Sequence, residues 1–252
     1  MMVTRGTPNG NRRGFTVALI GCDGAGKTTV ARELEQSSGL PVRYLYMGVS
    51  AESSNRQLPT TRLANAMKRS RGAAIVDHGP PDRDDAGPSD GVDARAAAPA
   101  ARTARQRARR SVRAGLRLAN RLAEEWYRQG LAQTYRARGA IVVFDRHFLA
   151  DYHAYDVAGS GRSLSRRVHG WMLSRAYPRP DLVVFLDAPP EVLHRRKGEG
   201  TLRSLARRRA DYLDLAGTSG MGGEFAIVSA TQPLPDVVGE VAGLIRDYAE
   251  RR

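Results

Sequence analysis

The residues best suited to chemistry lie in one short run, Gly21-Cys22-Asp23-Gly24-Ala25-Gly26-Lys27-Thr28. Glycine adopts positive φ angles without strain, so successive backbone N–H groups can turn inward around phosphate. At this spacing Lys27 reaches the β- and γ-phosphates of a nucleoside triphosphate, and the Thr28 hydroxyl holds Mg²⁺. The run therefore predicts a phosphate-binding loop.

The flanking segments predict the strand and the helix that such a loop requires. Residues 15–20 are apolar and predict a buried strand, and residues 29–35 predict a helix. The N-terminus of that helix adds partial positive charge beside the phosphates. The predicted donor-binding residues are Gly21, Gly24, Ala25, Gly26, Lys27, Thr28 and Thr29.

A second pair of residues suited to chemistry is Asp145-Arg146, directly after the apolar residues 141–144. In proteins with a phosphate-binding loop, an Asp at a strand end holds Mg²⁺ directly or through water. Arg146 would lie at the carboxyl edge of the sheet, where its planar guanidinium suits phosphate. The alternative is that Asp145 caps the next helix and pairs with Arg146. Asp187, at the end of the apolar run 182–187, is a rival candidate for Mg²⁺.

Cationic residues concentrate in a third segment, residues 195–209. This segment contains Arg195, Arg196, Lys197, Arg203 and Arg207-Arg208-Arg209. We predict a mobile lid that neutralises charge as the γ-phosphoryl group moves and that excludes water. The alternative is a solvated helix face.

Five short apolar runs predict five strands, at 15–20, 42–47, 141–145, 182–187 and 225–229. Long helical stretches separate them, and this alternation is typical of α/β proteins with a parallel sheet covered on both faces. Residues 1–13 predict a flexible tail. The Pro- and Asp-rich residues 71–101 predict a disordered insertion within a single domain that spans 14–252.

The stretch 103–138 predicts a long amphipathic helix, because its apolar residues recur at spacings of three and four. Trp126 and Tyr127 belong to this series, and both are expected to pack in the core or in an interface. Arginines occupy the opposite face. Aromatic residues do not interleave with them, so nucleic acid is not the expected partner.

Composition sets broader limits on the function. The chain has 252 residues, 40 of them basic and 26 acidic, for a formal charge of +14. Such a surface suits phosphorylated ligands, nucleic acid or anionic membranes, although a G+C-rich genome would also enrich arginine. Cys22 is the only cysteine, so no intrachain disulfide can form. With no transmembrane-length apolar run and no signal-peptide pattern, the expected location is cytoplasmic.

Taken in order along the chain, these motifs resemble the thymidylate kinase family of P-loop phosphotransferases. Residues 21–29 match that family's loop, Asp145-Arg146 its Asp-Arg motif, and residues 151–156 its Ser-Ser-x-Ala-Tyr-Gln-like segment. The run 182–187 and the lid complete the series. The resemblance implies a three-layer P-loop NTPase fold with strand order 2-3-1-4-5, and a homodimer.

The resemblance also implies a role for each site residue. ATP would be the donor, Mg²⁺ the metal ion, and Thr231 would border the adenine. The acceptor would contact Asp23, Tyr155 and Asp156, and Arg146 would bind its phosphoryl group. The remaining roles are catalysis by Lys27, Asp145, Arg146, Arg195 and Arg196, with Mg²⁺ held by Thr28 and Asp145.

The sequence departs from this family on the acceptor side. Residues 46–50 and 55–62 stand where the family carries an Arg-Glu-Pro-Gly-Gly-like segment, Asp156 replaces a Gln, and His147 replaces a Tyr. We expect an enzyme, a Mg²⁺-ATP-dependent small-molecule kinase with a nucleoside monophosphate acceptor such as dTMP. One alternative is a kinase that phosphorylates a metabolite hydroxyl, with Asp145 or Asp156 as general base. Another is a nucleic-acid-binding ATPase.

Overall fold

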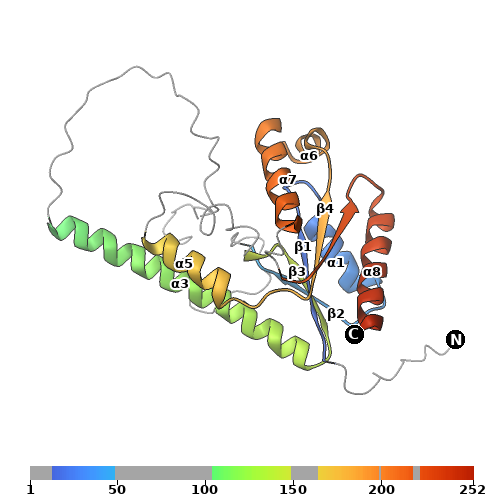
Figure 1. The fold of residues 1–252 in the computed structure, drawn as a ribbon, viewed down its shortest axis with the longest axis horizontal. Coiled ribbons are helices and arrows are strands. Elements are labelled where there is room, and N and C mark those ends of the chain that lie inside the picture. The colour runs from blue at the N-terminus through green and yellow to red at the C-terminus, as the bar shows by residue number, and fades with distance from the viewer. Residues whose placement is uncertain (1–12, 49–103, 149–163, 199, 218–221) are drawn as a thin grey trace, which may run out of the picture.

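The computed structural model describes residues 13–48, 104–148, 164–198, 200–217 and 222–252. The predicted insertion at 71–101 and nearly all of the predicted tail lie outside these ranges. Within them, strands and helices alternate along the chain (Figure 1). In order they are β1 (Thr16–Ile20), α1 (Lys27–Ser37), β2 (Val42–Tyr46), α3 (Ala104–Ala137), β3 (Ile141–Asp145), α5 (Leu164–Arg175), β4 (Leu182–Asp187), α6 (Pro190–Lys197), α7 (Leu202–Gly217), β5 (Glu224–Ser229) and α8 (Leu234–Arg251).

The five strands form one sheet in the order β2-β3-β1-β4-β5, and every neighbouring pair is parallel. This confirms the predicted α/β fold and strand order, which are those of a P-loop NTPase. The observed strands differ from the predicted runs by at most one residue at an end. Such shifts are expected because the terminal residue of an apolar run need not join the hydrogen-bonded ladder.

The sheet is buried on both faces because apolar side chains alternate between two cores. One core contains Val17 and Leu19 of β1 and is covered by α1 and α8. The other contains Ala18 and Ile20 of the same strand and is covered by α3 and α5. Helices on both sides make three layers (Figure 1), which explains why these strands are continuous apolar runs.

Helix α3 is the longest element and extends beyond the sheet, with α5 beside it (Figure 1). A buried polar contact joins the two helices, because the Nε2 atom of His169 lies 2.9 Å and 3.1 Å from the two carboxylate oxygens of Glu125. Trp126 packs edge-on against Tyr177 while remaining 41% exposed. Among the helices of the described ranges, none is long and apolar enough to span a bilayer.

The strand register brings the chemically interesting positions to one edge of the sheet. Leu19 of β1 lies opposite Asp145 of β3, and Tyr46 of β2 lies opposite the same Asp145. On the other side of β1, Ile20 lies opposite Phe185 of β4. The loop after β1 therefore emerges between the ends of β3 and β4, at the edge where ligands bind in open α/β sheets.

Candidate functional site

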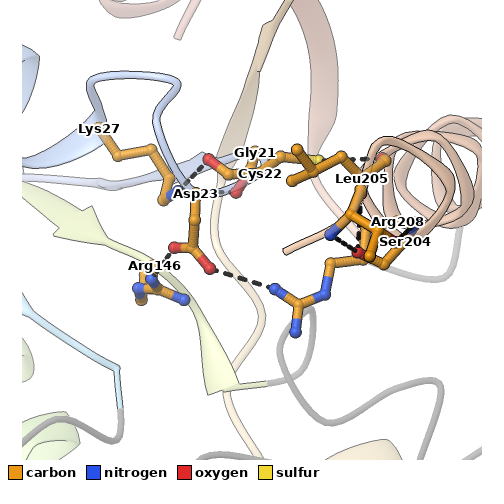
Figure 2. Close-up of polar contacts among 9 residues, drawn as sticks. Gly21, Cys22, Asp23, Lys27, Arg146, Ser204, Leu205 and Arg208 are labelled. Carbon is orange, nitrogen blue, oxygen red and sulfur yellow. Dashed lines mark hydrogen bonds and ion pairs between the residues drawn. The ribbon is translucent and has the colours of Figure 1, made fainter. Parts of the chain in front are cut away.

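Residues 21–26, here called the glycine loop, connect β1 to α1. Lys27, the first residue of α1, folds its side chain back over the loop. Its Nζ atom donates to the carbonyl oxygens of Gly21 and Cys22, both at 2.7 Å (Figure 2). The side chain is buried, so these hydrogen bonds compensate for the loss of water around the ammonium. The positive charge of Lys27 is thereby held at the centre of the loop.

Two helices pack behind the glycine loop. Gly24 has a φ of 88°, and a Cβ atom there would lie 2.8 Å from the carbonyl oxygen of Leu193 in α6. Only glycine fits this position, because other residues would be both strained and in collision. The Cys22 thiol lies 3.8 Å from the carbonyl oxygen of Leu205 in α7. Burial raises the pKa of that thiol to about 11, so Cys22 stays protonated and packs as a small apolar residue.

Asp145 lies at the end of β3, next to the start of α1. Its Oδ2 atom accepts hydrogen bonds from the Thr28 hydroxyl at 2.6 Å and the Tyr44 hydroxyl at 3.2 Å. Burial and the adjacent Asp145 charge raise the pKa of Tyr44, which therefore remains a donor. The Oδ1 atom of Asp145 is buried and has no hydrogen-bond partner within the described part of the chain.

The pair Thr28 and Asp145 fits a magnesium ion. Hydroxyl and carboxylate oxygens are the ligands that Mg²⁺ takes, and the ion commonly needs only one or two protein ligands beside waters and phosphates. The unpartnered Oδ1 atom of Asp145 offers such an oxygen. In the described ranges, no cluster of three or more His, Cys, Asp or Glu side chains suited to a metal ion occurs.

Arg146 follows Asp145 in a backbone conformation that is rare for its type, with a φ of 70°. Non-glycine residues with positive φ cost free energy and concentrate at functional sites. The Arg146 N–H donates to the Leu19 carbonyl oxygen at 3.1 Å, which holds the turn against β1. The guanidinium then forms an ion pair with Oδ1 of Asp23 in the glycine loop (Figure 2).

Asp23 carries a second ion pair, from its Oδ2 atom to Nη1 of Arg208 in α7 at 3.1 Å. Burial alone would raise the pKa of this carboxyl, but Arg146, Lys27, Lys197 and Arg208 together hold it well below its usual range. Asp23 is therefore ionised at neutral pH.

Asp187, the rival candidate for Mg²⁺, forms a different contact. Its two carboxylate oxygens accept from Nε and Nη2 of Arg209 in α7, at 2.6 Å and 2.7 Å. This two-bond pair raises the pKa of Arg209 further. Asp187 thus ties α7 to the end of β4, whereas Asp145 contacts Thr28.

The end of β2 meets Arg146 in a mostly buried cluster made of Tyr46, Gly48, Arg128 and Arg146. We call this cluster the acceptor edge because the sequence predicts that Arg146 binds the acceptor. Arg128 of α3 is buried, and its Nη1 atom donates to the Gly48 carbonyl oxygen at 2.7 Å. Its Nη2 atom pairs with Glu124 at 3.0 Å. A Cβ atom on Gly48 would lie 2.6 Å from Cδ of Arg146, so Gly48 lets the two segments approach closely.

His147 lies beneath this edge and is fully buried. Its ring contacts those of Phe144 and Tyr177, with centroid distances of 5.8 Å and 5.7 Å. Burial lowers the pKa of His147 to about 4, so the imidazole is neutral at physiological pH.

The structure brings together most of the site residues expected from the sequence. Lys27, Thr28, Asp23, Asp145 and Arg146 meet at one edge of the sheet. Of the two expected lid arginines, Arg196 donates to the Ala230 carbonyl oxygen at 2.8 Å, next to Thr231, and Arg195 is exposed. Tyr155 and Asp156 lie outside the described residues.

Three contacts of this site were not anticipated from sequence: those of Tyr44, Arg128 and Arg208. Tyr44 and Arg128 belong to elements far from Asp145 and Gly48 in the chain, so no local pattern marks them. Arg208 lay within the predicted lid, and a helical wheel places it three residues from the buried Leu205. That spacing was the available signal, since such residues share one helix face.

Comparison with known proteins gives a weak and partial similarity. No protein-family model matches the chain. A thymidylate kinase of Pseudomonas fluorescens (strain SBW25) is 31% identical over 140 residues, which cover 49% of this chain. The match spans 63% of that relative's length.

Proposed function

We propose that the protein is a Mg²⁺-ATP-dependent kinase that transfers the γ-phosphoryl group to a nucleoside monophosphate such as dTMP. The observation that carries the proposal is the contact between Asp23 and Arg146. It places an arginine suited to an acceptor phosphate directly against a loop suited to the donor triphosphate. The partial similarity to a thymidylate kinase supports the same activity.

On the donor side, Lys27 and the backbone N–H groups of the glycine loop bind the triphosphate. The Lys27 ammonium exchanges carbonyl acceptors of its own loop for phosphate oxygens. Thr28 and Asp145 hold Mg²⁺, which neutralises charge on the phosphates when it is bound. Gly21, Gly24, Ala25, Gly26 and Thr29 complete the loop and the start of α1.

On the acceptor side, Arg146 binds the phosphoryl group of the nucleotide through its planar guanidinium. The attacking oxygen of such an acceptor is already anionic at neutral pH, so no general base is required. Asp23 faces the acceptor sugar, and Tyr155 and Asp156 complete its binding site.

Arg195 and Arg196 belong to the lid in this proposal, and Thr231 borders the adenine. The hydrogen bond from Arg196 to Ala230 supports this placement, because it brings the lid beside the segment that contains Thr231. Lid arginines then stabilise charge on the moving phosphoryl group and exclude water from it.

We also propose a cytoplasmic homodimer formed through α3 and α5. Large apolar side chains are exposed on these two helices, at Val112, Leu116, Leu164, Val168 and Trp171. Burial of such side chains between two copies would stabilise a dimer. Light scattering should give twice the chain mass, and a monomer that persists at micromolar concentration would contradict this part of the proposal.

The activity is tested by measuring Mg²⁺-dependent ATP consumption with a panel of acceptors: dTMP, other nucleoside monophosphates, nucleosides and sugars. We expect turnover with a nucleoside monophosphate well above the acceptor-free background. No turnover with any nucleoside monophosphate would overturn the proposed acceptor.

A metabolite hydroxyl is the second candidate acceptor, favoured by the acidic residue at position 156 where the resembling family has Gln. Such an acceptor needs a general base. Turnover with a nucleoside or sugar, abolished by Asp156→Asn while ATP still binds, would establish this alternative.

A further inference from the structure

Asp23 is the one residue of the glycine loop that joins two arginines in the described part of the site. Figure 2 shows its carboxylate between Arg146, which follows β3, and Arg208, on α7. All three side chains keep between 20% and 31% of their surface exposed. Because Asp23 belongs to the loop that is expected to bind phosphate, this arrangement suggests a role in binding.

Helix α7 presents one face to the glycine loop and the sheet edge. Leu205 contacts Cys22, Arg208 pairs with Asp23, and Arg209 pairs with Asp187. These residues are three and four positions apart, which places them on one side of a helix. Arg207 is exposed on another side. The Arg208 side chain is therefore held at the loop by the packing of its own helix.

Asp23 and an anionic acceptor compete for the same guanidinium. A carboxylate and a phosphate bind arginine in the same planar, two-bond manner. Without Arg208, Asp23 could bind Arg146 through both of its carboxylate oxygens and compete more strongly with the acceptor for that guanidinium. In the structure Arg208 pairs with Oδ2 of Asp23 and Arg146 with Oδ1, so the two arginines share one carboxylate and Arg146 is held less firmly than it would be as the sole arginine.

We propose that Arg208 is a positioning residue for the acceptor: it holds Asp23 so that Arg146 remains available to the acceptor's phosphoryl group. This inference rests on the proposed function, because it takes Arg146 as the acceptor's phosphate ligand. It makes the docking of α7 a determinant of acceptor affinity, although Arg208 itself contacts neither substrate.

The test compares Arg208→Gln with Arg207→Gln, which removes the same charge from the same helix. For Arg208→Gln we expect the KM for dTMP to rise about tenfold, while the KM for ATP changes less than about twofold. A tenfold change corresponds to about 1.4 kcal/mol, within the range of coupled charge pairs. Arg207→Gln should change the dTMP KM by less than about threefold.

A double-mutant cycle separates positioning from a general structural role. In the Asp23→Asn background, Arg208→Gln should change the dTMP KM less than about twofold, because the carboxylate that it restrains is gone. Arg208→Lys, which keeps a cation, should stay within about threefold of the wild type. If Arg208→Gln fails to fold, the Arg208→Lys variant still tests the inference.

The outcomes distinguish failure of this inference from failure of the proposed function. Wild-type protein that does not turn over dTMP would overturn both. An active wild type in which Arg208→Gln behaves like Arg207→Gln would overturn the inference alone. A tenfold effect that persists in Asp23→Asn would do the same, since it would show that Arg208 acts independently of Asp23.

Discussion

The glycine loop and the acceptor edge lie side by side but are built in different ways. The loop is determined by neighbours in sequence: Lys27 donates hydrogen bonds to the carbonyl oxygens of Gly21 and Cys22, six and five residues before it. The acceptor edge depends on a contact between distant segments, since Arg128 of α3 bonds to Gly48, eighty residues earlier. The glycine loop can therefore be recognised from a local sequence motif, whereas the contacts of the acceptor edge are seen only in the folded chain.

This difference indicates that the acceptor edge can change its ligand more readily than the glycine loop can. A loop whose function depends on its own backbone tolerates few changes, and here its residues match a widely shared motif. An edge assembled from several elements can change its ligand by substitutions on any of them. Of the departures from the family pattern, His147 directly follows Arg146 in the chain, and position 156 lies outside the described residues.

The largest effect is expected for Lys27→Ala, which tests the loop alone. Loss of one preorganised charge at a reacting phosphate should reduce kcat by about 10²–10³-fold. Arg246→Ala, an exposed arginine on α8, is the control and should keep the wild-type rate. Wild-type rates in Lys27→Ala would show that the loop assignment is wrong.

Substitution of Arg146 tests the acceptor edge in two ways. Both Arg146→Ala and Arg146→Gly should lower kcat/KM for the acceptor by about a hundredfold, because the phosphate ligand is lost. Their stabilities should differ, since glycine accepts the positive φ at this position and alanine does not.

We therefore expect the glycine variant to have the higher free energy of unfolding, by about 1 kcal/mol. Urea denaturation measures this difference. Equal stability of the two variants would mean that residue 146 is not strained.

A smaller effect concerns the proposed binding of Mg²⁺ by Thr28 and Asp145. Asp145→Asn should raise the Mg²⁺ concentration for half-maximal activity about tenfold. Asp187→Asn should change it less than about threefold, because Asp187 is paired with Arg209. Titration of activity with Mg²⁺ compares them, and the reverse ranking would reassign the ion to β4.

The last effect is one on stability and not on activity, and it concerns the buried His147. His147 has a pKa of about 4 in the folded chain because it is buried, whereas an unfolded His titrates near 6.5. The unfolded chain therefore binds more protons between these values, and this contribution to stability is full above about pH 6.5 and is lost toward pH 4.

His147→Phe should flatten the fall in unfolding free energy over that window, by up to about 1.4 kcal/mol per pH unit. Urea denaturation at several pH values measures the slope. Parallel curves for the variant and the wild type would show that His147 does not titrate in this way.

The sheet and the loop could be predicted from sequence because their signals are local. Apolar runs that lie buried on both faces mark strands such as 141–145, and the glycine and lysine spacing marks the loop. The ends of such strands meet at one edge, so the approach of Asp145 to Thr28 also follows from topology.

The roles of individual arginines could not be predicted in the same way. Residues 195–209 contain many of them, and only the docking of α7 decides that Arg208 meets Asp23 and Arg209 meets Asp187. Arg128 is a similar case, since its burial against Gly48 depends on how α3 crosses the end of β2. Contacts of this kind join side chains far apart in sequence, and charge alone does not select among them.

Phosphoryl transfer by this protein can be followed through the γ-phosphoryl group itself. ATP labelled on its γ-phosphate should be incubated with Mg²⁺ and dTMP, with wild-type protein and with Lys27→Ala. We expect label in a nucleoside diphosphate with the wild type and at least about a hundredfold less with Lys27→Ala. Label only in inorganic phosphate, or equal transfer by both proteins, would contradict this expectation.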